Sequence, residues 1–165
     1  MAPTTADASE RDALLLRKAV DLAAANVLNS GGPFGAIVVA ADGREFEGLN
    51  RVTANLDPTA HAEVTAIRNA CQRLGTFSLD GATLYTSCEP CPMCLASTLW
   101  ARIDRVLYAA DRTDAAAAGF DDAAFYQYFD QPSIRDTVMP VRQLRLDSAV
   151  EPFNAWNASG NRLDY

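Results

Sequence analysis

The chain has 165 residues, of which 49% are hydrophobic and 21% charged, a composition typical of one globular domain and not of a disordered or fibrous protein. Its formal net charge is −7, from 14 basic and 21 acidic side chains, so the chain would repel phosphate backbones and anionic lipids. We therefore expect neither a nucleic acid nor a membrane as its partner.

The cysteines and the amino-terminal residues indicate the compartment. Three of the four cysteines, Cys88, Cys91 and Cys94, fall within seven residues, which indicates metal or redox chemistry rather than a secreted disulfide framework. Residues 1–7 carry no basic segment followed by an apolar one, so the sequence predicts no signal peptide and a cytoplasmic location. The single histidine, His61, excludes a mechanism that needs two imidazoles.

The first third of the chain predicts a helix and a hairpin. Residues 1–8 have the character of a flexible terminus. From Ser9, apolar residues recur every three or four positions, which predicts a helix that ends at Gly31-Gly32-Pro33. The continuous apolar run 34–41 predicts a buried strand, and after a two-residue turn 45–50 predicts an antiparallel, more exposed one.

The middle of the chain alternates helices with strands. Asp57-Pro58 has the residue types of a helix cap and a first helical position, which predicts a helix that ends at Gly75. Residues 82–86 predict a short strand, 93–101 a helix and 103–110 another strand.

The last third is less regular. We expect a helical turn at 113–119, a short helix at 121–129, an edge strand at 141–146 and a tail over 149–165. The whole pattern predicts a single domain over residues 1–165, built as a three-layer α/β/α sandwich around a mixed sheet of about five strands.

Two short motifs carry the chemistry. His61 and Glu63 stand at one predicted helix start, and Cys91 and Cys94 stand at another. The N–H groups and dipoles of two helix ends that meet at one place favour thiolates there. One histidine and two cysteines suit a tetrahedral zinc ion that keeps a fourth position for water. Glu63 is then placed to take the proton of that water and to return it to a ring nitrogen and the leaving amine.

The pattern H-x-E…P-C-x-x-C is the signature of zinc nucleobase deaminases, and the chain resembles the cytidine-deaminase superfamily over nearly its full length. It is most similar to the guanine and guanosine deaminase branch. The segments that carry this resemblance are Gly32-Pro33-Phe34-Gly35, Asn50, Pro58–Val64, Thr86–Cys94, Trp100-Ala101-Arg102, Ala118–Asp122 and the end from Pro152-Phe153 through Trp156 to Tyr165.

The resemblance implies roles for further residues. It implies that Phe34 and Trp100 pack on the purine, that Asn50 hydrogen-bonds it and that Asp122 recognises its edge. It also implies a homodimer in which the C-terminal segment, with Tyr165, covers the active site or crosses to the partner subunit. The stretch Ala158-Ser159-Gly160 is small compared with that segment in the branch, which leaves room for a ribose.

Other interpretations of the same residues stay open. Cys88, Cys91 and Cys94 with His61 have the composition of a closed structural zinc site, which would leave Glu63 without a role. Cys91 and Cys94 alone have the spacing of a redox pair. Phe34 and Trp100 can be core residues, since aromatic residues at such positions often are. Asn50 can cap a strand end and Asp122 can cap a helix. The tail can be a surface helix.

The sequence therefore predicts a zinc-dependent aminohydrolase that deaminates a guanine-type purine, guanosine slightly in preference to guanine, and releases ammonia. The alternatives are a cytosine or cytidine deaminase, a tRNA adenosine deaminase, or a zinc-stabilised binding module without catalysis. The charge of −7 and the lack of a Lys/Arg cluster argue against a tRNA substrate.

Overall fold

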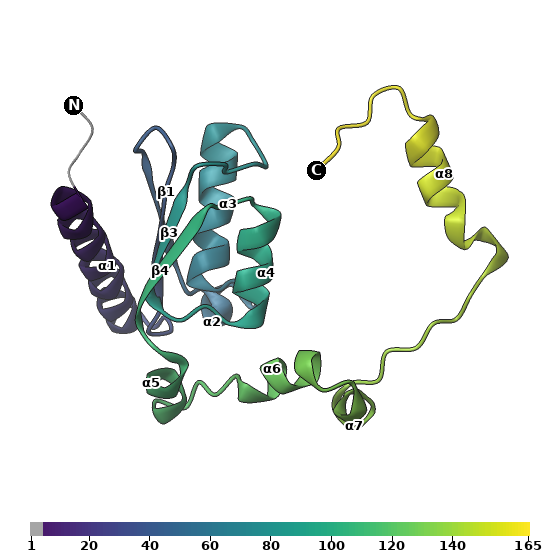
Figure 1. Cartoon of the computed structure of the whole chain (residues 1–165). Coiled ribbons are helices and arrows are strands. Elements are labelled where there is room, and N and C mark those ends of the chain that lie inside the picture. Colours follow the sequence, from purple (N-terminus) through teal and green to yellow (C-terminus); the bar gives the residue numbers. More distant parts are fainter. Residues whose placement is uncertain (1–4) are drawn as a thin grey trace. The chain divides into compact units, whose positions relative to one another are not determined.

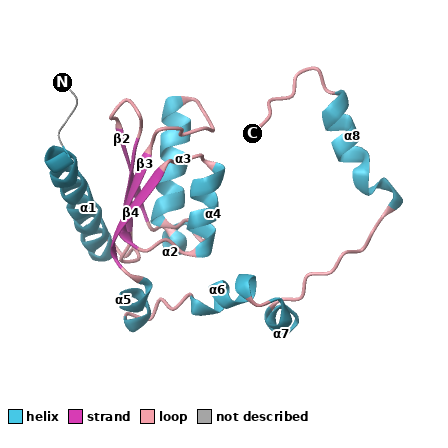
Figure 2. Cartoon of the chain, viewed as in Figure 1, coloured by secondary structure: helices cyan, strands magenta, loops and turns pink. Residues whose placement is uncertain are grey.

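A computed structural model describes residues 5–165 (Figures 1 and 2). Its contacts divide the chain into two units, one ending at Asp122 and one spanning Ala123–Tyr165, and each is described by itself. The first unit contains α1 (Thr5–Leu28), β1 (Gly35–Val39), β2 (Glu45–Leu49), α2 (Val52–Asn55), α3 (Ala62–Leu74), β3 (Thr83–Cys88), α4 (Pro92–Trp100), β4 (Arg105–Ala110) and α5 (Arg112–Ala117).

The four strands form one mixed sheet in the order β2-β1-β3-β4. Strand β1 pairs antiparallel with both β2 and β3, whereas β3 and β4 are parallel. A parallel pair needs a crossover connection, and α4 supplies it between β3 and β4. The predicted mixed sheet is confirmed, although it has four strands here and not about five.

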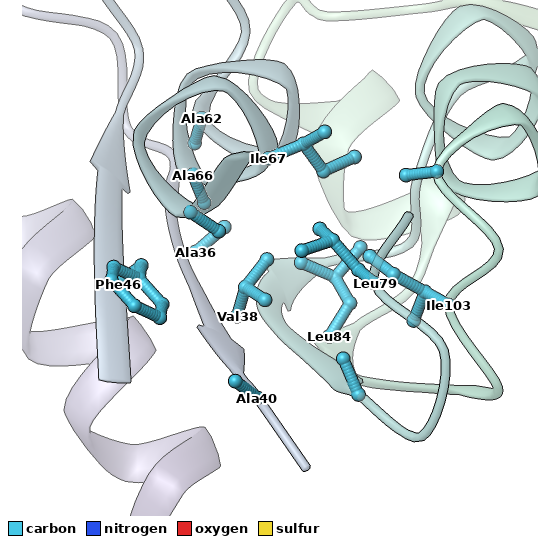
Figure 3. Close-up of a cluster of buried hydrophobic side chains, with 13 residues drawn as sticks. Ala36, Val38, Ala40, Phe46, Ala62, Ala66, Ile67, Leu79, Leu84 and Ile103 are labelled. Atoms are coloured by element: carbon cyan, nitrogen blue, oxygen red, sulfur yellow. The ribbon is translucent and has the colours of Figure 1, made fainter. Parts of the chain in front are cut away.

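Each face of the sheet is covered by helices, so the predicted three-layer α/β/α arrangement is also confirmed (Figure 1). Strand β1 is buried along its whole length, and its side chains alternate between the two faces. Ile37 and Val39 pack with Leu15 and Ala19 of α1, on one side. On the other side the core lies under α3 and consists of small and aliphatic side chains, among them Ala36, Val38, Ala62, Ala66, Ile67 and Leu84 (Figure 3).

A polar cluster also joins α1 to the sheet. The Tyr85 hydroxyl of β3 donates a hydrogen bond to the Asp12 carboxylate. The Arg105 guanidinium of β4 donates two hydrogen bonds of 2.9 Å to the same carboxylate. Burial and the neighbouring Asp12 raise the pKa of Tyr85 to about 12. This cluster ties the long first helix to the two strands that flank α4 in sequence.

Helix α3 lies very close to β2, and a glycine makes this possible. A Cβ atom at Gly48 would collide with the backbone of Ala62 and Ala66. The small residue therefore lets the first turn of α3 rest directly on the strand. This contact determines where the start of α3 lies.

The second unit contains α6 (Ala123–Asp130), the 3₁₀ turn η1 (Pro132–Ile134), α7 (Arg135–Val138), the 3₁₀ turn η2 (Asp147–Val150) and α8 (Glu151–Ala158). Within it, Arg135 donates hydrogen bonds to the carbonyls of Tyr128 and Phe129, and Arg142 pairs with Asp136. No helix among the described residues combines the length and the apolar character needed to cross a bilayer.

Three element predictions are wrong. The predicted edge strand 141–146 has no strand structure, because an alternating pattern becomes a strand only when an edge is available for pairing, and this segment pairs with none. The second helix begins at Ala62 and not at Asp57-Pro58. The Asp57 carboxylate instead accepts hydrogen bonds from the backbone N–H and hydroxyl of Thr59, which makes a turn in place of a helix cap.

The third difference concerns the amino terminus. Helix α1 begins at Thr5, four residues before the predicted start at Ser9. Residues 5–8 of the expected flexible terminus are thus helical, and residues 1–4 lie outside the described residues. The tail predicted from 149 onward coincides with η2, α8 and the last residues of the second unit.

Candidate metal centre and active site

Two helix starts bring the candidate metal ligands together. His61 is the N-cap residue of α3 and Cys91 is the N-cap residue of α4; both have extended backbones, and neither side chain caps its own helix. Cys94 lies in the first turn of α4, after Pro92 at the first helical position. Because α3 and α4 pack beside each other on one face of the sheet, their amino-terminal ends supply all three side chains (Figure 1).

The three ligand atoms form a small triangle. The His61 Nδ1 atom is 3.7 Å from the Cys91 sulfur and 3.5 Å from the Cys94 sulfur, and the two sulfurs are 3.6 Å apart. Zinc bonds of about 2.3 Å to sulfur and 2.0–2.1 Å to nitrogen, at tetrahedral angles, put neighbouring ligand atoms about 3.5–3.8 Å apart. The triangle therefore fits one zinc ion with a fourth position left for another ligand.

The charges in the triangle suit a cation. A hydrogen bond from Cys94 and the adjacent His61 lower the pKa of Cys91 to about 4. The same hydrogen bond to Cys91, together with burial, raises the pKa of Cys94, and the hydrogen bond to Cys91 raises the pKa of His61. Cys91 is thus the one of the three groups whose pKa is shifted toward the charged, thiolate form. A divalent cation would replace the protons of these groups, which is how metal binding couples to deprotonation of cysteines.

Glu63 is a buried carboxyl group in the first turn of α3. Its residue is 5% exposed, and burial is the main reason why its pKa is raised. The Cys94 side chain is a hydrogen-bond partner of this carboxyl. A carboxyl with a raised pKa beside a metal centre can exchange a proton near neutral pH, which is the property that a general acid–base needs.

Cys88 does not join the triangle. Its thiol contacts the backbone carbonyl of Asp111 at 3.7 Å, and burial raises its pKa to about 11. Among residues 5–165, the group of side chains placed to hold a metal consists of His61, Cys91 and Cys94. The structure thus gives no support to the closed site of three cysteines and one histidine.

Two of the residues predicted to contact substrate lie in adjoining turns of the first unit. Asn50 is 8% exposed, and its side-chain oxygen accepts a hydrogen bond of 3.3 Å from the Val52 N–H. The Phe34 ring packs against the core under α3 and meets the Phe120 ring edge to face, with 5.0 Å between ring centroids.

Asp122 lies in the electrostatic field of the metal cluster. Burial and the negative charge of Cys91 raise the pKa of Asp122, and Asp122 in turn helps to raise the pKa of His61. The charge of the candidate metal ligand Cys91 therefore affects the pKa of the Asp122 carboxyl.

Trp100 lies away from the three candidate metal ligands, and Tyr165 is part of the other unit. Trp100 is the last residue of α4, 66% exposed, and about 13 Å along the helix axis from the N-cap Cys91. Tyr165 belongs to the second unit, where its ring lies edge to face with Trp156 at 6.3 Å. Their predicted contacts with substrate stay predictions.

One residue near the metal ligands was not singled out from the sequence. The Glu89 carboxylate accepts a hydrogen bond of 3.1 Å from the Arg112 N–H and lies 3.8 Å from the Arg112 guanidinium. It thereby ties the loop before Cys91 to the start of α5, and α5 leads to Asp122. Its position directly before Pro90-Cys91 was the sequence signal that could have pointed to it, but a single Glu forms no recognisable motif.

Comparison with known proteins identifies the family. The profile of the cytidine and deoxycytidylate deaminase zinc-binding region matches residues 9–110. The chain belongs to this family. It is 51% identical to the guanine deaminase of Bacillus subtilis over 151 residues, which cover 91% of this chain and 96% of that protein. A solved structure of the Bacillus subtilis guanine deaminase matches 92% of this chain and 97% of its own with a TM-score of 0.87.

Other members of the family are less similar. The tRNA-specific adenosine deaminase of Haemophilus influenzae is 34% identical over 79% of this chain and 73% of its own length. A solved structure of guanine deaminase from Nitrosomonas europaea is 35% identical, with a TM-score of 0.61 over 66% of this chain and 63% of that one. The resemblance, the zinc cofactor and the class of zinc-dependent hydrolase predicted from the sequence are thus confirmed.

The open and closed metal sites make opposite predictions for Cys88→Ala. Because the Cys88 sulfur faces the Asp111 carbonyl and not the triangle, we expect this variant to keep one zinc per chain. Cys71→Ala is the matched control at a cysteine outside the site, and Cys94→Ala should lose stoichiometric zinc. Zinc content of the purified variants is the measurement; loss of zinc from Cys88→Ala would contradict the open site.

Proposed function

We propose that this chain hydrolytically removes the 2-amino group of a guanine-type purine and releases it as ammonia. The observation that carries the proposal is 51% identity to a guanine deaminase across 91% of the chain. The joined starts of α3 and α4, with one histidine, two cysteines and a buried glutamate, have the chemistry that such a reaction needs.

The metal ligands and Glu63 have separate tasks in this proposal. His61, Cys91 and Cys94 would hold the zinc ion, which would supply a water with a pKa lowered toward neutrality. Glu63 takes a proton from that water, because its buried carboxyl has a raised pKa. It would then pass this proton to the purine ring nitrogen, and pass the second proton, taken from the same oxygen after it has added to C2, to the leaving amine. Water is consumed, the C2–N bond breaks, and the ring keeps the oxygen, so that guanosine becomes xanthosine and guanine becomes xanthine.

We assign substrate recognition to Asp122, Asn50 and Phe34. A guanine ring offers N–H donors that the Asp122 carboxylate can accept, and the Asn50 amide can both donate and accept. The influence of Asp122 on His61, and that of Cys91 on Asp122, supports a place beside the reacting atoms. The Phe34 ring would pack on the purine from the turn before β1.

We assign the remaining predicted contacts to a homodimer in the cytoplasm. Exposed apolar side chains on α4, Leu99 and Trp100, suit burial against a second copy, and Trp100 would reach a purine from such an interface. The C-terminal segment with Tyr165 would cover the active site of its own or the partner subunit. Ala158-Ser159-Gly160 is small and exposed, and for this reason we favour guanosine slightly over guanine.

Ammonia release from a panel of substrates tests the proposal directly. We expect turnover of guanosine and guanine and none of adenine, adenosine, cytosine or cytidine. A tRNA adenosine substrate is disfavoured by the net charge of −7, although a tRNA-specific relative is 34% identical. Deamination of an adenine or cytosine compound, with guanine and guanosine untouched, would refute the proposed substrate class.

Glu63→Gln keeps the shape of the side chain but removes its ability to carry a proton. General acid–base catalysis contributes about 10²–10⁴-fold to a rate, so we expect kcat to fall at least about a hundredfold while zinc stays bound. Steady-state kinetics and zinc content of the same preparation check this. A zinc-loaded variant that loses less than tenfold would remove Glu63 from the reaction.

Asp122→Asn tests recognition of the purine edge. A buried donor on the substrate without its acceptor costs about 1–3 kcal/mol, or roughly ten- to a hundredfold in kcat/KM. We expect that loss with unchanged zinc content and thermal stability. Asp121→Asn, the exposed neighbour, is the matched control. If Asp122→Asn lowers stability and leaves kcat/KM of the folded protein unchanged, the carboxylate has only a structural role.

Deletion of residues 157–165 tests the tail. If the tail closes over the substrate, the deletion should lower kcat/KM for both substrates and change their ratio, because a closed site excludes water. Mixing the truncated protein with a Glu63→Gln chain that has an intact tail should restore activity if the tail crosses between subunits. A folded truncated protein with the kinetics of the full chain would reduce the tail to a surface segment.

A further inference from the structure

A closed ring of hydrogen bonds joins the end of α1 to both turns that carry the proposed purine contacts. The Asn26 side-chain amide donates to the Gly32 carbonyl at 2.8 Å and to the Asn50 carbonyl at 3.0 Å. The Phe34 N–H donates to the same Gly32 carbonyl at 2.8 Å, and the Asn50 N–H donates to the Phe34 carbonyl at 3.2 Å. Each of these residues is thereby held relative to the others.

The orientation of the Asn26 amide is determined by its partners. Both partners are carbonyl oxygens, so the atom that faces them must be the amide nitrogen. Asn26 is only 1% exposed, and the other end of the group, the Oδ1 atom, is buried without a hydrogen-bond partner among the described residues. A buried acceptor without a partner is costly, so the two hydrogen bonds that the amide nitrogen makes come with a cost in stability at the other end of the group.

The neighbouring glycines show that the chain is built around this side chain. A Cβ atom at Gly31 would overlap the amide of Asn26, and a Cβ atom at Gly32 would lie 2.9 Å from the Asn50 Oδ1 atom. Both positions therefore need glycine for the space that it leaves. The Asn26 carbonyl also accepts hydrogen bonds from the Asn29 and Gly31 N–H groups, which closes the turn after the helix.

The residues that follow Asn50 connect this ring of hydrogen bonds to His61. Arg51, directly after Asn50, donates its N–H to the Ala60 carbonyl at 2.9 Å. Ala60 precedes His61, the N-cap residue of α3. The position of Asn50 is therefore connected on one side to Asn26 and on the other to the start of α3.

We propose that Asn26 is a positioning residue for substrate binding: without contact to the purine, its amide holds Phe34 and Asn50 at the places from which they meet the ring. The inference rests on the proposed roles of Phe34 and Asn50. Because the amide nitrogen faces both carbonyls, the Oδ1 atom is left without a hydrogen-bond partner among the described residues. Residues placed by such supporting bonds keep a binding site within the narrow geometry that recognition needs.

The test replaces the amide and measures substrate binding separately from the chemical step. Asn26→Leu keeps nearly the same volume and removes both donors, and Asn26→Ala removes the side chain. We expect the KM for guanosine and guanine to rise about tenfold, the factor that corresponds to one unmade buried hydrogen bond. We expect kcat to change less than about threefold and zinc to stay at one per chain, since the lost interaction is made equally in the ground and transition states.

Two further variants complete the design. Asn29→Ala is the matched control, because its exposed amide donates to the Ala25 carbonyl of α1, and its KM should equal that of the parent. Gly31→Ala displaces the Asn26 amide without removing it and should raise KM as Asn26→Leu does. This variant carries the test if the Asn26 variants do not fold.

A double-mutant cycle separates positioning from general stabilisation. If Asn26 acts through Phe34 and Asn50, Asn26→Leu should change KM less than about twofold in a background that carries both Phe34→Ala and Asn50→Ala, whereas independent effects would multiply. If Asn26→Leu has the KM of the parent while Asn50→Ala has a raised KM, the inference about Asn26 is overturned but the proposed purine contact of Asn50 is not. A parental KM in Asn50→Ala overturns the proposed purine contact and the inference with it. If the effects of the substitutions on KM multiply, the inference is also overturned.

Discussion

The close packing of helix α3 on strands β1 and β2 is the constraint on which the site depends. Gly48 has no side chain, and the facing residues Ala62 and Ala66 are small, so the helix backbone rests directly on the sheet. This depth is why Glu63, in the first turn, is almost fully buried. A bulkier residue at any of these positions would lift α3 and move His61 and Glu63 away from Cys91 and Cys94.

The site gathers groups that would repel one another without a cation. Three ligand atoms within 3.5–3.7 Å, a buried carboxyl and Asp122 nearby place several potential negative charges in a small volume. The helix N-termini at His61 and Cys91 offset part of this charge, since their N–H groups carry partial positive charge. Burial is the main reason why the pKa values of Glu63 and Asp122 are raised, and the negative charge of Cys91 adds to it; a divalent ion between the two helix starts would offset that charge.

The supports of this site lie outside its motifs. Glu89 connects the loop before Cys91 to α5, and Asn26 connects the end of α1 to the turns that hold Phe34 and Asn50. The Glu89–Arg112 contact joins residues 23 positions apart and the Asn26–Asn50 contact residues 24 positions apart, so neither leaves a local pattern. Buried polar side chains with backbone partners of this kind rigidify a site because every alternative arrangement leaves a carbonyl or N–H group unpaired.

The sequence by itself determined the family motif, the three candidate metal ligands that the structure brings together, and most of the sheet. A continuous apolar run is enough to predict β1, and residue types at fixed spacings are enough to predict a zinc site, because both follow from local chemistry. Only the tertiary structure decided the start of α3, where Asp57 binds Thr59 in a turn rather than capping a helix, and the absence of strand structure at 141–146. It also decided that Cys88 turns to Asp111 and that Asn26 spans two turns, because such choices depend on partners far away in the sequence.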